Sequence, residues 1–74
     1  MDKLVQILKE IRPGIDFENQ SGLVDNDFLN SLDIVALITE INDEFDVIIP
    51  PEEITPENFN SAKAIYELIN RLQK

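Results

Sequence analysis

The sequence predicts an all-α fold, a bundle of three main helices and one short helix with a long first loop. Apolar residues recur at the i, i+3, i+4, i+7 spacing of a helix face in three segments. Residues that typically begin or end helices flank these segments. The chain has 74 residues, of which 43% are hydrophobic, so it can form one small core. We therefore expect a single domain over residues 1–74.

The first helix is expected over residues 2–12. Asp2 can cap its start, and Pro13 with Gly14 ends it. Its inner face is expected to consist of Leu4, Ile7, Leu8 and Ile11. Residues 13–29 then show no sustained period and predict a long loop, which is uncommon in compact domains and often functional. The loop is expected to be anchored by scattered apolar side chains: Ile15, Phe17, Leu23, Val24, Phe28 and Leu29.

The strongest helical pattern covers residues 31–45. Asn30 suits the N-cap position, and Asp33 at the third helical position completes a pair that resembles a capping box. After residues 47–49, Pro50 and Pro51 close the segment, because a proline pair cannot continue a helix. The core face of this helix is expected to be Ile34, Leu37, Ile38, Ile41 and Phe45.

Two further helices complete the expected bundle. Thr55 followed by Pro56 predicts the start of a short helix over residues 56–60. Ser61 is expected to cap a final helix that ends near Leu72. The inner side of this last helix is expected to be Ala62, Ile65, Tyr66, Leu68 and Ile69.

The charge of the chain is strongly acidic and unevenly distributed. Fifteen acidic and six basic residues give a net charge of -9. The basic residues are confined to the two ends of the chain: Lys3, Lys9, Arg12, Lys63, Arg71 and Lys74. The charged residues within the range 13–62 are all acidic: Asp16, Glu18, Asp25, Asp27, Asp33, Glu40, Asp43, Glu44, Asp46, Glu52, Glu53 and Glu57. Such a block would repel nucleic acid and an anionic membrane, and it would attract a basic partner.

Composition also limits the chemistry that is expected. The chain has neither Cys nor His, so it lacks the usual metal ligands and the commonest base at neutral pH. We therefore expect no metal site and no catalytic residue. No apolar run is long enough for a transmembrane span, and the N-terminus lacks the layout of a signal peptide. A cytoplasmic monomer without stable membrane insertion is the expectation.

The helix over residues 31–45 has a second apolar stripe besides its core face. It consists of Leu32, Val35, Ala36 and Thr39, with Ser31 at its N-terminal end. The stripe either contacts the long loop or forms an exposed binding face, because a helix in a small bundle needs only one apolar stripe to pack. Acids on the same helix would suit docking to a basic, partly apolar surface: Asp33, Glu40, Asp43 and Glu44. Such docking should be weak and sensitive to salt.

Ser31 stands at the start of this helix, after the long loop. Taken alone, it is a common helix-start residue, and no His is present to activate it as a nucleophile. A helix N-terminus does stabilise an attached phosphate, through its dipole and its free backbone N–H groups. A phosphodiester on Ser31 is therefore electrostatically acceptable despite the acidic surroundings.

Around Ser31 the sequence resembles the acyl carrier protein family. Residues 27–33 read Asp-Phe-Leu-Asn-Ser-Leu-Asp, and residues 43–50 read Asp-Glu-Phe-Asp-Val-Ile-Ile-Pro. In that family an Asp-Ser-Leu motif opens the second helix, which ends in Glu-Glu-Phe before a short hydrophobic segment and Pro. The resemblance covers the whole chain and implies an acyl-carrier-like four-helix bundle. It also implies that Ser31 carries a covalent 4'-phosphopantetheine arm, whose thiol holds a cargo as a thioester.

The resemblance further implies partners and a docking surface. The partners would be a phosphopantetheinyl transferase, an acyl- or aminoacyl-loading ligase, and acyl-processing enzymes with basic docking surfaces. The residues expected to dock onto them are Asn30, Leu32, Asp33, Val35, Ala36, Thr39, Glu40 and Asp43.

Two departures from the family pattern leave the cargo open. Asn30 replaces the usual Asp before the serine, and Ala36 and Asn42 stand where fatty-acid carriers often have acids. The main interpretation is an acyl carrier of a fatty acid, polyketide or related pathway. The departures favour a specialised carrier, and an aminoacyl or peptidyl carrier, including a D-alanyl carrier, is the alternative. A further alternative is an unmodified helical interaction domain, in which Ser31 is only a helix-start residue.

Overall fold

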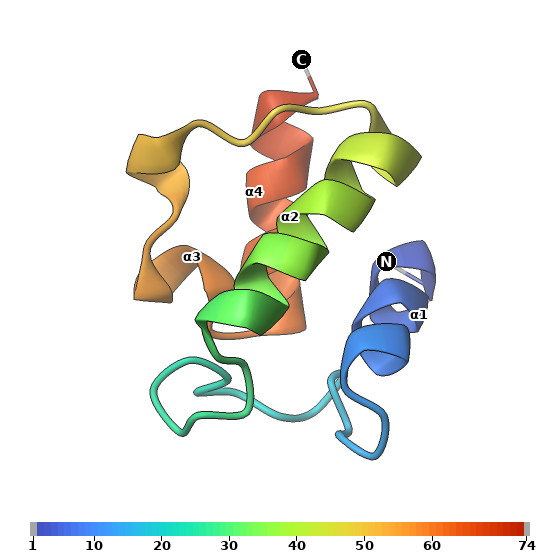
Figure 1. Cartoon of the computed structure of the whole chain (residues 1–74), viewed down its shortest axis with the longest axis vertical. Helices are drawn as coiled ribbons and strands as arrows, with labels where there is room; N and C mark the ends of the chain where they lie inside the picture. The colour runs from blue at the N-terminus through green and yellow to red at the C-terminus, as the bar shows by residue number, and fades with distance from the viewer. Residues whose placement is uncertain (1, 74) are drawn as a thin grey trace.

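Helices account for most of the ordered backbone in residues 2–73, the part of the chain that the computed structural model describes (Figure 1). The elements are α1 (Asp2–Ile11), α2 (Ser31–Phe45), the 3-10 turn η1 (Pro51–Glu53), α3 (Pro56–Phe59) and α4 (Ala62–Leu72). Within these residues, strand pairing is limited to one isolated bridge between Ser21 and Ser61. The predicted all-α bundle of three main helices and one short helix is confirmed, with η1 as an element that was not predicted. None of the described helices is long and apolar enough to cross a membrane.

Helix α1 packs against α2 and is joined to it near both ends. Leu4, Ile7 and Leu8 are buried, as their spacing predicts. Near the start of α1, Lys3 lies 3.2 Å from Glu44 at the end of α2; just after α1, Arg12 lies 2.9 Å from Asp33 at the start of α2. The two ion pairs therefore show that the helices run antiparallel. The Lys3–Glu44 pair is largely exposed, so it contributes little stability.

Helix α2 spans the residues that the apolar stripe predicted. Leu37 and Ile41 are fully buried, and the other predicted core residues, Ile34, Ile38 and Phe45, are partly buried against the core. The helix ends because Asp46 adopts a left-handed conformation with φ of 55°, and its N–H donates to the carbonyl of Asn42 at 3.1 Å. The helix thus stops before the two prolines, and an irregular segment connects it to η1.

The hydrophobic core lies where α1, α2 and α4 meet. Helix α4 contributes Ala62, Ile65, Leu68 and Ile69, while its Tyr66 is only partly buried. The two largest fully buried side chains are Phe17 from the loop and Phe59 from α3. Burial of such a side chain stabilises a fold by about 1.5–3 kcal/mol. Because Phe17 and Phe59 come from outside the three main helices, the loop and α3 are part of the fold's stability.

The predicted long loop between α1 and α2 is confirmed and is held by its apolar residues. Phe17, Leu23 and Leu29 are at most 2% exposed. Gly22 has a φ of +66°, a conformation that side chains disfavour, and an added Cβ would clash with the side chain of Asn26. The loop is therefore a closely folded segment that leads directly to the start of α2.

Candidate functional site at the start of helix α2

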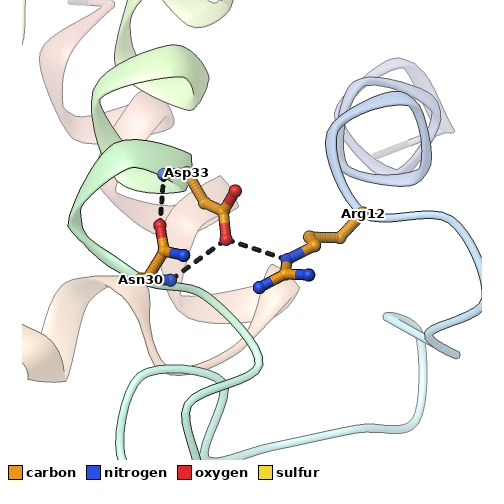
Figure 2. A network of polar contacts seen from close by, with 3 residues as sticks. All are labelled: Arg12, Asn30 and Asp33. Atoms are coloured by element: carbon orange, nitrogen blue, oxygen red, sulfur yellow. Dashed lines mark hydrogen bonds and ion pairs between the residues drawn. The ribbon is translucent and has the colours of Figure 1, made fainter.

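Ser31 is the first residue of α2, and it is exposed. The residue before it, Asn30, is the N-cap, as the sequence predicted. The Asn30 side-chain oxygen accepts a hydrogen bond from the backbone N–H of Asp33 at 2.9 Å (Figure 2). The helix is thus capped without the Ser31 hydroxyl, which leaves that hydroxyl available for another role.

The cap forms part of a three-residue network of polar contacts, shown in Figure 2. One carboxylate oxygen of Asp33, Oδ2, accepts from the backbone N–H of Asn30 at 3.1 Å, which completes the capping box. The same oxygen accepts from Nε of Arg12 at 2.9 Å. Asn30 therefore serves fully as the cap of α2.

Arg12 is the residue of this network that sequence reasoning missed. It lies 21 positions before Asp33, just after α1, and no local pattern links the two. A lone cation is unfavourable at a helix N-terminus, but here the Asp33 carboxylate pairs with it. The Asp33 side chain is only 16% exposed, so its charge is largely engaged within the protein. The predicted docking role of Asp33 stays a prediction beside this structural one.

The second apolar stripe of α2 is an exposed face. Leu32 is 80% exposed and Val35 is 62% exposed. Ala36 and Thr39 are also exposed, and the Thr39 hydroxyl donates to the carbonyl of Val35 at 3.1 Å. Of the two alternatives for this stripe, contact with the loop is therefore excluded for Leu32 and Val35. Exposed apolar side chains clustered on one helix face suit a binding surface.

The acids of α2 fall into two groups. Asp33 and Glu44 pair with cations from the α1 region. Glu40 and Asp43 are exposed, and no ion pair holds either of them among residues 2–73. The unpaired negative charge of α2 is therefore concentrated in the second half of the helix, on the C-terminal side of the apolar pair Leu32 and Val35.

The start of α2 also fits a phosphate-linked group. Ser31 and Leu32 occupy the first two helical positions, whose backbone N–H groups have no partner within a helix. These groups and the helix dipole favour negative charge next to the Ser31 oxygen. The exposed hydroxyl is accessible to a large enzyme. The donor set present is thus compatible with a phosphodiester at this position.

A groove of about 510 Å³ lies on α1, outside the α2 surface, and is lined by Asp2, Val5, Gln6, Lys9, Glu10 and Glu18. Within residues 2–73, no cluster of Asp and Glu side chains is arranged to hold a metal ion.

Comparison with known proteins identifies a matching family and two relatives, all of them carriers or phosphopantetheine sites by their descriptions. The family described as "Phosphopantetheine attachment site" matches residues 2–72. Aminoacyl carrier protein 2 of Bradyrhizobium diazoefficiens is 41% identical over 63 residues, which cover 85% of this chain and 70% of the relative. Aminoacyl carrier protein 1 of the same organism is 41% identical over 68 residues, which cover 90% of this chain and 74% of the relative. No solved structure matches the chain.

The division of roles between Asn30 and Ser31 can be tested by alanine substitution. Asn30→Ala removes the cap and is expected to lower the free energy of unfolding by about 1 kcal/mol. Ser31→Ala should change it by less than about 0.5 kcal/mol, because the hydroxyl caps nothing. Urea unfolding followed by circular dichroism measures both. Equal destabilisation by the two variants would mean that Ser31 is a structural helix-start residue.

Proposed function

The chain belongs to the phosphopantetheine attachment site family, and from this premise we propose that it is an aminoacyl carrier protein with its arm on Ser31. The resemblance seen in the sequence is confirmed at the level of the carrier family. Members of this family hold 4'-phosphopantetheine covalently. Which residue holds it here, and which cargo it carries, are the two parts of the proposal.

Ser31 is the best supported attachment residue among the three serines of the chain, Ser21, Ser31 and Ser61. The Ser61 hydroxyl accepts from the backbone N–H of Ala64 at 3.0 Å and so caps α4. Ser21 lies in the loop, where it pairs with Ser61 in the isolated bridge. Ser31 alone combines an exposed hydroxyl with the start of a long helix. The unmodified interaction domain has less support, because Ser31 is not needed as a cap.

The residues around Ser31 have distinct roles in this proposal. When bound, the arm supplies a thiol that holds the cargo as a thioester. The N–H groups of Ser31 and Leu32 stabilise the phosphate charge next to the Ser31 oxygen. The Asn30–Asp33 box keeps those N–H groups in place at the first turn. The protein contributes binding and orientation here, which supports a non-catalytic role as the substrate of other enzymes.

The proposed aminoacyl cargo is inferred from the names of the two relatives. Two proteins with 41% identity over most of this chain are aminoacyl carrier proteins. This similarity supports the aminoacyl alternative better than the fatty acid or polyketide interpretation of the sequence.

The partners follow from this role. They are a phosphopantetheinyl transferase, a ligase that loads the amino acid, and an enzyme that accepts it. Leu32 and Val35 supply an apolar contact, while Glu40 and Asp43 supply the charge that attracts a basic surface.

The attachment site is tested by intact mass after incubation with coenzyme A and a broad-specificity phosphopantetheinyl transferase. In this transfer the Ser31 oxygen bonds to the phosphorus next to pantetheine and loses its proton. The phosphoanhydride bond breaks, and adenosine 3',5'-bisphosphate leaves. Wild type and the control Ser21→Ala should each gain one phosphopantetheine, and Ser31→Ala should gain none. Modification of Ser31→Ala, or none of the wild type, contradicts the proposed attachment.

The cargo is tested on protein purified from its own cell with the thioester intact. We expect an intact mass that exceeds the phosphopantetheine form by one aminoacyl group. Hydroxylamine should remove this group and leave the arm, since it cleaves thioesters. A fatty acyl mass would instead support the acyl carrier interpretation.

The docking face is tested with a charge placed on it. Val35→Lys should lower kcat/KM for phosphopantetheine transfer roughly tenfold, because a buried interface contact is replaced by a charge that basic partners repel. Helicity should stay near that of wild type, since Val35 is exposed. Ile54→Lys is the control, because it introduces the same charge at another partly exposed apolar residue outside α2. An equal loss in both variants would place docking elsewhere.

A further inference from the structure

We propose that Asn60 is a positioning residue for the modification of Ser31, because it holds the loop that leads to the serine in one shape. This inference rests on the proposed function, and it names a residue far from Ser31 in the sequence. Asn60 follows α3 and lies at the corner between α3 and α4. Its neighbours fix that corner, since Thr55 caps α3 and Ser61 caps α4 through side-chain hydrogen bonds.

Asn60 makes four hydrogen bonds to the loop between α1 and α2. Its backbone carbonyl accepts from the N–H of Leu23 at 2.8 Å. Its side-chain oxygen accepts from the backbone N–H groups of Val24 at 3.0 Å and of Asp25 at 3.2 Å. Its side-chain amide donates to Oδ2 of Asp25 at 2.9 Å. One residue therefore satisfies three consecutive backbone N–H groups of the loop and one of its carboxylates.

These contacts are the polar attachment of residues 22–29 to the rest of the described chain, next to the isolated bridge that pairs Ser21 with Ser61. Within residues 22–29, the remaining hydrogen bonds stay inside the loop: Asn26 to Gly22, Asp27 to Val24, and Leu29 to Leu23. Every hydrogen bond that leaves this segment for another part of the described chain ends on Asn60. Apolar burial of Leu23 and Leu29 holds the loop near the core, but such burial is non-directional. The hydrogen bonds to Asn60 are directional, so they fix the conformation of the loop.

The held segment leads directly to Ser31. The backbone N–H of Leu29 donates to the carbonyl of Leu23 at 2.9 Å, and Leu23 is in turn bonded to Asn60. Leu29 is followed by the cap Asn30 and then by Ser31. A short series of backbone contacts thus connects Asn60 to the residue before the cap. On the other side, Arg12 holds the first turn of α2 through Asp33.

The effect on function follows from the need of an enzyme to bind around Ser31. An enzyme that modifies Ser31 has to contact the residues just before it as well as the exposed face of α2. A loop that samples many conformations presents the matching shape only part of the time, which weakens apparent binding in proportion. Loss of the Asn60 side chain should therefore raise KM for the carrier and leave kcat nearly unchanged.

The test compares phosphopantetheine transfer onto wild type, Asn60→Ala and Asn58→Ala with the same transferase and coenzyme A. Asn58 is the matched control, because it is also half-buried at α3 and its amide donates to the carbonyl and a carboxylate oxygen of Glu53. We expect Asn60→Ala to raise KM about tenfold, the effect of a loop that adopts the matching shape about one tenth of the time. Asn58→Ala should stay within about twofold of wild type at a similar loss of stability.

A charge exchange provides the rescue. Asn60→Asp alone places a carboxylate beside that of Asp25 and should impair transfer. The double variant Asp25→Asn with Asn60→Asp restores an amide-to-carboxylate bond in the reverse direction and should recover most of the wild-type KM. It also retains the oxygen that accepts from Val24 and Asp25. If Asn60→Ala is unfolded, this pair of variants decides the question.

Hydrogen exchange gives a readout that does not depend on the transferase. The amides of residues 24 and 25 should exchange faster in Asn60→Ala than in Asn58→Ala. Equal KM values for Asn60→Ala and Asn58→Ala, or no recovery in the double variant, would overturn the positioning role while the proposed function stands. If wild type itself is not modified, the proposed function fails, and this inference fails with it.

Discussion

The capped first turn of α2 is the constraint on which the candidate site depends. Asn30 and Asp33 exchange hydrogen bonds between side chain and backbone, and Arg12 binds the same carboxylate. Such a cap is worth about 1 kcal/mol, a sizeable share of the stability of a small domain. The Arg12–Asp33 pair is partly exposed and adds little energy, but it fixes α1 relative to the start of α2. With the cap supplied by Asn30, the next residue is free to present its hydroxyl outward.

The same helix has a buried packing face and an exposed apolar face. Leu37 and Ile41 are fully buried, whereas Leu32 and Val35, on the opposite side, are largely exposed. Three basic residues near the ends of the chain form ion pairs: Lys3 with Glu44, Arg12 with Asp33, and Arg71 with Glu53. Glu40 and Asp43 are left unpaired among the described residues. The exposed face of α2 is therefore apolar and acidic, without a basic residue of its own.

The helices could be predicted from the sequence because their signals are local. The bounds of α2 follow from a cap residue, an apolar stripe and a helix stop within a short stretch. The contacts Arg12–Asp33 and Asn60–Asp25 could not be predicted, since their partners lie 21 and 35 positions apart and carry no periodic pattern. Periodicity also identified the second stripe of α2 but not whether it is exposed, because spacing shows which apolar residues share a helix face and not which surfaces pack together. The exposure of Leu32 and Val35 required the packed structure.

A carrier that serves several enzymes in succession needs contacts that form quickly and release quickly. Charges at the edge of an interface mainly raise the association rate, whereas buried apolar contacts mainly set the dissociation rate. On the proposed docking face, Glu40 and Asp43 are the exposed charges, and Leu32 and Val35 are the exposed apolar pair. Such a face favours brief complexes over stable ones, since its apolar contact is small and its charges are screened by salt. Under the proposed function, specificity for one partner would come largely from the shape around Ser31, where the cap orders the first turn of α2 and Asn60 binds the preceding loop.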